Sequence, residues 1–136
     1  MKIGLIGRNS THFEAYSNLF INRGFQCSYL NENAPLKKIT STKSLSNLSL
    51  EDMVNSSDLI MITNRFANEH LPVLKKIIEL EKYKGKIFID KPIVQDLNEV
   101  NSILELKNKF DFNKITSFSP LRFCKELEKL NRDNSL

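Results

Sequence analysis

Short apolar runs alternate with longer amphipathic segments along this chain. Runs typical of strands buried in a sheet occupy residues 2–7, 25–30, 58–63, 86–90 and 114–118. Apolar side chains recur at helical spacing from Phe13 to Arg23, from 68 to 82 and from 96 to 109. This alternation predicts an α/β fold: a Rossmann-like, doubly wound parallel sheet with helices on both faces.

Capping signals predict the starts of two helices. Ser49 with Asp52 indicates a capping box ahead of a short helix, and Asp96 with Glu99 indicates a second one. The apolar residues expected to face inward from the second of these helices are Leu97, Val100, Ile103 and Leu104.

Two stretches are harder to assign. Residues 31–48 contain Pro35 and show no clear period, which predicts a loop with a short strand near 37–39. Near the end of the sequence, Phe123, Leu127 and Leu130 predict a closing helix.

Composition favours one globular domain and argues against several function classes. The 136 residues, 40% of them hydrophobic, suit a single core. No apolar run approaches the ~20 residues of a membrane span, and the N-terminal run is too short for a signal peptide, so we expect a cytoplasmic protein that binds no membrane. The net charge of +4 comes from lysines interspersed with glutamates, which is typical of solvated helix faces rather than of a nucleic-acid surface. Cys27 and Cys124 are expected to be reduced, and no metal site is predicted.

Ligands of open parallel sheets bind beyond the carboxyl ends of the strands, so the loops there hold the candidate chemistry. The first loop, Gly7 to His12, stands where a dinucleotide-binding GxGxxG would lie but keeps only its first glycine. Asn9 tolerates a left-handed backbone, whereas His12 would loosen the packing of helix against strand. Ser10, Thr11 and the first N–H groups of the helix either bind phosphate oxygens or form an ordinary N-cap.

Four more residues have both a functional and a structural interpretation. Asn31 and Glu32 either bind a ribose or belong to a turn. His70 either faces the site or is hydrogen-bonded at the edge of the core. Lys91 follows an apolar strand and is held by Pro92, so it suits binding of a phosphate or hydroxyl, or proton transfer. The alternative for Lys91 is a surface ion pair with Asp90 or Asp96.

Four blocks in this order resemble the nucleotide-binding half of the glucose-fructose oxidoreductase and inositol dehydrogenase (Gfo/Idh/MocA) family. The blocks are IGLIGRNSTHFEAY, TNRFANEHL, GKIFIDKPIVQDLNEV and SFSPLRFCKEL. The third holds the family's lysine-proline signature as Asp90-Lys91-Pro92, and the last resembles its Ser-x-x-Leu-Arg-[FY] segment. The resemblance covers nearly the whole sequence.

The resemblance implies a nicotinamide dinucleotide, NAD or NADP with NAD slightly favoured, and hydride transfer to or from a sugar or cyclitol carbon. Arg8 beside Glu32 leaves the choice of coenzyme open. Lys91 is implied as the catalytic residue, between the coenzyme's ribose and the substrate. The residues implied to bind the coenzyme are Gly7, Arg8, Asn9, Ser10, Thr11, His12, Glu32, Thr63, Asn64, Arg65, His70, Lys91 and Pro92.

In this family a second domain provides the substrate wall. We therefore expect a dinucleotide-binding domain over 1–120 and, over 121–136, a helix that in the family leads to a substrate domain absent here. Such a half-site orients substrate poorly and admits water, so a second polypeptide or self-association is expected to complete it. The alternative is a non-catalytic nucleotide-binding or protein-interaction module. A phosphoacceptor receiver domain is disfavoured, because Arg8-Asn9-Ser10 replaces the acidic pair that holds Mg²⁺.

Overall fold

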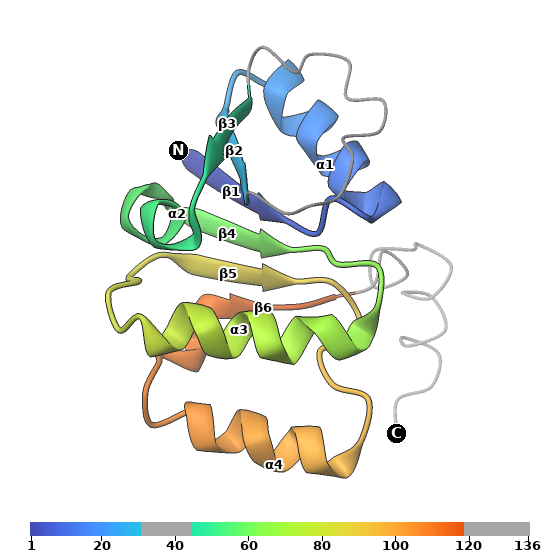
Figure 1. Cartoon of the computed structure of the whole chain (residues 1–136), viewed down its shortest axis with the longest axis vertical. Helices are drawn as coiled ribbons and strands as arrows, with labels where there is room; N and C mark the ends of the chain where they lie inside the picture. The colour runs from blue at the N-terminus through green and yellow to red at the C-terminus, as the bar shows by residue number, and fades with distance from the viewer. Residues whose placement is uncertain (31–44, 119–136) are drawn as a thin grey trace, which may run out of the picture.

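The part of the chain that the structure describes forms a six-stranded parallel sheet in the order β3-β2-β1-β4-β5-β6 (Figure 1). The computed structural model describes residues 1–30 and 45–118. The strands are β1 (Lys2–Ile6), β2 (Gln26–Leu30), β3 (Leu45–Leu48), β4 (Leu59–Ile62), β5 (Lys86–Ile89) and β6 (Ile115–Thr116). The helices are α1 (Thr11–Asn22), α2 (Leu50–Ser56), α3 (His70–Glu79) and α4 (Leu97–Leu106), with 3₁₀ turns η2 (Ala67–Glu69) and η3 (Phe112–Lys114). The chain winds outward in both directions from β1, so the predicted Rossmann-like class is confirmed.

Helices cover both faces of the sheet, and the sheet divides the hydrophobic core into two clusters. On one face, Phe13 of α1 packs with Ile3 and Leu5 of β1. On the other face, α2 and α3 contribute to a cluster that includes Ile62 of β4 and Leu74 of α3. Because the central strands are buried on both sides, they are apolar without interruption, which is why the hydrophobic pattern predicted them.

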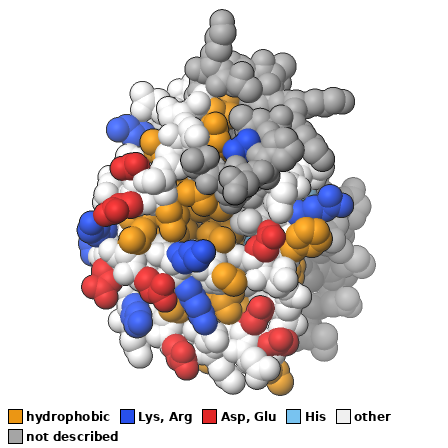
Figure 2. Space-filling view, viewed as in Figure 1, with side chains coloured by type: hydrophobic (Ala, Val, Ile, Leu, Met, Phe, Trp, Pro, Cys, Tyr) orange, Lys and Arg blue, Asp and Glu red, His pale blue; other side chains and the backbone are white. Residues whose placement is uncertain are grey.

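Charged side chains of both signs mingle over α3 and α4 on the face seen in Figure 2. This mixture agrees with the solvated helix faces predicted from the lysine and glutamate pattern. Within the described ranges, no helix combines the length and the apolar character needed to cross a membrane.

Gly7 brings the ends of β1 and β4 close together. Its φ is +103°, a conformation that L side chains rarely adopt. A Cβ at this position would lie 2.5 Å from the carbonyl carbon of Thr63 and 2.6 Å from the Cα of Asn64. The surviving glycine of the first loop is therefore required by packing between two neighbouring loops of the sheet.

Two predictions of local structure are wrong. Residues 45–48 lie in the predicted loop but form the edge strand β3, because Ser46 and Asn47 can stay exposed there and give no apolar pattern. In α4, Leu97 and Leu104 are 81% and 56% exposed, although both were expected to face inward. This helix packs beside α3 at the outer part of the domain, so only a narrow stripe of it is covered. The strand predicted near 37–39 and the closing helix lie outside the described residues.

Candidate functional site

The loops after β1, β4 and β5 enclose a pocket of about 270 Å³ at the carboxyl edge of the sheet. It is lined by Asn9, Ser10, Thr11, His12, Asn64, Arg65, Asp90 and Lys91. All of these except Asp90 were singled out from the sequence as coenzyme-binding candidates. The structure thus brings together side chains from three separate segments of the chain.

The N-terminus of α1 opens into this pocket. Ser10 is the N-cap: its Oγ accepts a hydrogen bond from the His12 backbone N–H at 3.1 Å, and its own N–H donates to the Gly7 carbonyl at 3.0 Å. Thr11, the first residue of the helix, is exposed. Unpaired N–H groups and the helix dipole favour negative charge at such an end. The Ser10 hydroxyl therefore caps the helix, and the helix end itself suits an anion.

Asn9 joins the β1 loop to the β4 loop. Its Oδ1 accepts a hydrogen bond from the Arg65 backbone N–H at 3.2 Å, and its Nδ2 donates to Glu69 Oε2 at 3.4 Å. Asn9 stands where the second glycine of a GxGxxG would be. Its side chain thus fixes the spacing of two loops that line the pocket.

Asp90 is the residue of the site that the sequence analysis did not single out as functional. Its carboxylate is buried at the end of β5, where Oδ1 accepts a hydrogen bond from the Lys91 N–H at 2.9 Å and Oδ2 pairs with Nδ1 of His12. The sequence feature that could have identified Asp90 is an acidic residue at the carboxyl end of a buried strand, directly before the candidate Lys91. Burial, followed by the charge of Asp90, raises the pKa of the nearby Tyr16 phenol.

The expected loosening of α1 by His12 does not occur. The His12 side chain is 46% exposed and points toward Asp90, while Phe13 and Ser17 are the buried residues of the helix. The residue that replaces the third glycine therefore lies beside the pocket and not between helix and strand.

Lys91 is exposed at the pocket, and its peptide bond to Pro92 is cis. Within residues 1–30 and 45–118, no ion pair includes its ammonium group. The alternative of a pair with Asp90 or Asp96 is not found: Asp90 binds His12, and Asp96 caps α4 by accepting from the Glu99 N–H at 2.9 Å. The Lys91 ammonium therefore remains available to a ligand.

Two of the candidates lie behind the pocket wall. Thr63 is fully buried, and its hydroxyl donates to the Ile6 carbonyl at 2.7 Å. His70 is 2% exposed, with Nδ1 2.8 Å from the Pro92 carbonyl oxygen and Nε2 2.9 Å from that of Asn64. A neutral imidazole donates through one nitrogen only, whereas an imidazolium donates through both. Both side chains hold the loops from within, and for His70 this is the predicted core-edge alternative.

Asn64 offers the pocket an acceptor. It is buried, it lines the pocket, and in the described part of the chain its Oδ1 has no hydrogen-bond partner. Buried polar atoms rarely stay unsatisfied, so this oxygen is suited to a donor from a bound ligand such as a hydroxyl.

Arg8 lies beside β2 rather than in the pocket. Its guanidinium stands 4.9 Å from the centre of the Tyr29 ring. Asn31 and Glu32, the predicted ribose-binding positions, lie outside the described residues.

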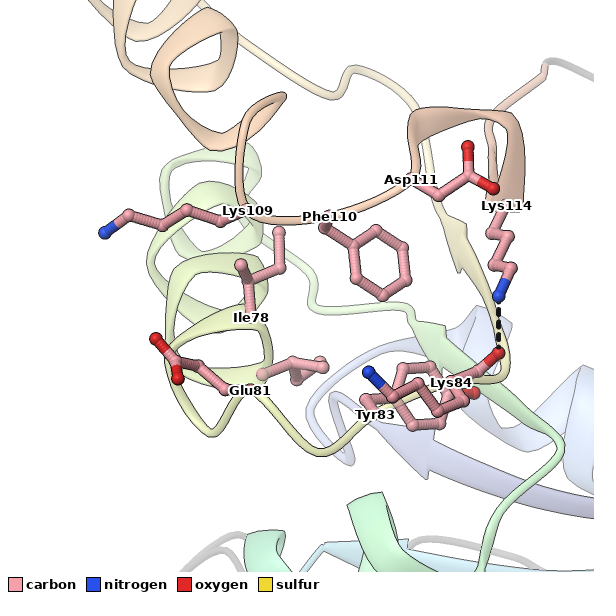
Figure 3. A pocket seen from close by; sticks show the side chains of 9 residues that line it. Ile78, Glu81, Tyr83, Lys84, Lys109, Phe110, Asp111 and Lys114 are labelled. Atoms are coloured by element: carbon pink, nitrogen blue, oxygen red, sulfur yellow. Dashed lines mark hydrogen bonds between the residues drawn. The ribbon is translucent and has the colours of Figure 1, made fainter.

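A smaller hollow of about 130 Å³ lies near the amino ends of the strands, where α3 ends (Figure 3). The rings of Tyr83 and Phe110 stack there with their centres 6.3 Å apart, and the Lys114 ammonium donates to the Lys84 carbonyl at 3.0 Å. None of the candidates lines this hollow. Within the described ranges, no group of three His, Cys, Asp or Glu side chains is arranged to hold a metal ion.

No protein-family model matches the chain, and no curated protein matches it in sequence. Solved structures do share its fold. The myo-inositol dehydrogenase from Lactobacillus casei, in complex with NAD(H) and myo-inositol, superposes with a TM-score of 0.69 at 14% identity, over 96% of this chain and 42% of that one. Biliverdin reductase from Synechocystis, in complex with biliverdin and NADP⁺, gives 0.67 at 16% identity, over 98% and 42%.

The transcriptional regulator Gal80p from Kluyveromyces lactis is a third structure of this fold, with a TM-score of 0.63 at 15% identity over 92% of this chain and 33% of that one. The chain therefore spans less than half the length of these proteins. At such identities the likeness shows the fold alone.

Proposed function

We propose that this chain is the NAD(P)-binding domain of an oxidoreductase of the Gfo/Idh/MocA type that acts on a sugar or cyclitol. The observation that carries the proposal is the pocket at the carboxyl edge, where the N-terminus of α1 and the Lys91 ammonium lie together. The family resemblance of the four sequence blocks supports it. The coenzymes named for the inositol dehydrogenase and the biliverdin reductase of the same fold also support it.

The residues of the pocket fit part of a dinucleotide. The helix end and Arg65 suit the diphosphate, and the Lys91 ammonium and the unsatisfied Oδ1 of Asn64 suit ribose hydroxyls. Ligand pockets usually hold about 300–1,000 Å³, so a volume of about 270 Å³ suits a diphosphate and ribose better than a whole dinucleotide. When bound, the nicotinamide supplies hydride transfer.

Lys91 is the catalytic residue of this proposal. Its ammonium is exposed at the pocket and would donate a hydrogen bond to the reacting oxygen of the substrate. The remaining wall of the substrate site would come from further protein, in the same or a second polypeptide.

Calorimetric titration with NADH and with NADPH tests the proposal. We expect one of the two coenzymes to bind with a Kd of millimolar or lower. Lys91→Ala should raise this Kd about tenfold, because losing a charge-assisted hydrogen bond costs about 1.4 kcal/mol of binding free energy. Lys86→Ala is the matched control, because Lys86 is exposed at the other end of the same strand and should not matter. Absence of binding to both coenzymes, or equal effects of the two substitutions, would reject the proposal.

The second candidate is a non-catalytic interaction module of the same fold. The loss of two glycines from the first loop favours it, as do the exposed Leu97 and Leu104 on α4. Sedimentation equilibrium would distinguish the candidates. Self-association that disappears in a Leu97→Glu, Leu104→Glu variant supports this module, whereas a monomer that binds coenzyme supports the oxidoreductase.

A further inference from the structure

The geometry points to His12 and Asp90 as the acid–base pair of this site. Asp90 acts as the positioning residue, and Nε2 of His12 accepts or donates the proton of a substrate hydroxyl held in the pocket. The inference rests on the proposed function, which supplies an alcohol and ketone as the substrate class. It adds a proton carrier to Lys91, which was the sole catalytic candidate from the sequence.

The contacts of Asp90 fix where the imidazole proton lies. An ionised carboxylate only accepts hydrogen bonds. One oxygen of Asp90 accepts from the Lys91 N–H and the other faces Nδ1 of His12, so Nδ1 carries a proton in this arrangement. Nε2 is then the nitrogen with a free lone pair, and it is the one that can take up a proton from a ligand and give it back.

The pocket gives Nε2 access to a ligand. His12 lines the pocket, its side chain is 46% exposed, and Nε2 has no hydrogen-bond partner within residues 1–30 and 45–118. His70, the other histidine, has both ring nitrogens against carbonyl oxygens and is buried. Of the two histidines, His12 is therefore the one placed to exchange a proton with a bound molecule.

The charged groups around the His12 ring include a counter-ion for an imidazolium. Asp90 is the acid among the residues lining the pocket, Lys91 and Arg65 are the cations, and the Tyr16 ring packs edge-on with centres 6.4 Å apart. An imidazolium formed at His12 has its counter-ion in direct contact. This is the electrostatic arrangement by which a buried aspartate supports a general base.

The proton and the electrons balance in the proposed step. When an alcohol is oxidised its C–H bond breaks, and an oxidised nicotinamide, if bound, would supply the acceptor for the hydride and its two electrons. Its O–H bond breaks, the proton passes to the lone pair on Nε2, and C–O becomes C=O. In the reduction of a ketone, Nε2–H returns the proton to the oxygen.

Nitrogen NMR of the imidazole rings tests the pair without any coenzyme. The chain has two histidines, so His12→Gln assigns both sets of signals. We expect neutral His12 to carry its proton on Nδ1. Asp90→Asn leaves one acceptor oxygen in place of two and should move the population toward the Nε2–H tautomer, whereas Asp90→Glu should retain Nδ1–H.

Asp58→Asn is the matched control for Asp90→Asn. It makes the same charge change at an aspartate that accepts from the Lys2 N–H, near the amino ends of the strands, and it should leave the His12 signals unchanged. An Nε2–H tautomer in the wild type, or an Asp90→Asn spectrum identical to the wild type, would overturn the inference.

Acylation by diethyl pyrocarbonate tests whether Nε2 can be reached. We expect His12 to be modified at least tenfold faster than His70, and saturating NADH to slow the reaction. Equal rates of acylation at His12 and His70 would overturn the inference. Failure of NADH to bind, with the Nδ1–H tautomer and the fast acylation both present, would instead reject the proposed coenzyme, while the pairing of His12 with Asp90 and the access to Nε2 would stand.

Discussion

Replacing Glu81 by glycine should stabilise the protein. Glu81 lies just beyond the C-terminus of α3 (Figure 3). Its φ is +52°, and its N–H donates to the Ile78 carbonyl at 2.9 Å. Glycine usually occupies this left-handed position after a helix. A side chain there costs roughly 1–2 kcal/mol, and glycine loses roughly 0.5–1 kcal/mol more conformational entropy on folding. The difference predicts a gain of about 0.5–1 kcal/mol.

Urea unfolding measures this gain directly. The midpoint should rise without a change in the slope of free energy against urea, and Tm should rise by roughly 2–4 °C. Glu79→Gly is the matched control, because Glu79 is the last residue of α3 and has a right-handed conformation. There the same change should cost roughly 0.5–1 kcal/mol. A loss of stability in Glu81→Gly, or shifts of the same sign in both variants, would refute the reasoning.

Three further substitutions test the fold around the site and the far edge of the sheet. Gly7→Ala should cost about 2–4 kcal/mol in chemical denaturation, because φ is +103° and the new Cβ would meet the backbone of Asn64. Ser10→Ala removes the cap of α1 and should cost about 1 kcal/mol, with a parallel loss of NADH affinity; an unchanged melting curve would contradict the capping role. Burial raises the pKa of the Tyr83 phenol, whose hydroxyl donates to the Lys86 carbonyl at 2.7 Å. The free energy of unfolding should stay constant up to about pH 10 and fall above it, because the Tyr83 phenol ionises at a lower pH in the unfolded chain than in the folded one. In a pH series of unfolding curves, Tyr83→Phe should make this fall smaller.

The parts of the fold that the sequence predicted are those whose burial leaves a continuous pattern. The β4 segment, Leu59–Ile62, is a continuous apolar run because both faces of the sheet are covered at this strand, and the run is enough to find it. The edge strand β3 has no such requirement, since Ser46 and Asn47 can face water. In α4, Leu97 and Leu104 have the spacing of a core stripe but lie on the uncovered side, which only the packing of α4 beside α3 decides.

The candidate site could be predicted as a set of loops but not as a set of contacts. The rule for parallel sheets located the loops, and the structure brings their residues into one pocket. The pairing of His12 with Asp90 joins residues 78 positions apart, so no local spacing reveals it. For Thr63, polarity alone cannot tell a ligand contact from a hydrogen bond to a backbone carbonyl, and the structure shows the latter.

The bridge made by His70 carries one more consequence. Its ring is a rigid plate held between the carbonyl oxygens of Asn64 and Pro92, one from each of two neighbouring loops. The buried imidazole therefore sets the distance between the two loops, and with it the width of the pocket that they border. A substitution at His70, which is buried away from the pocket, can therefore change which ligands the pocket accepts.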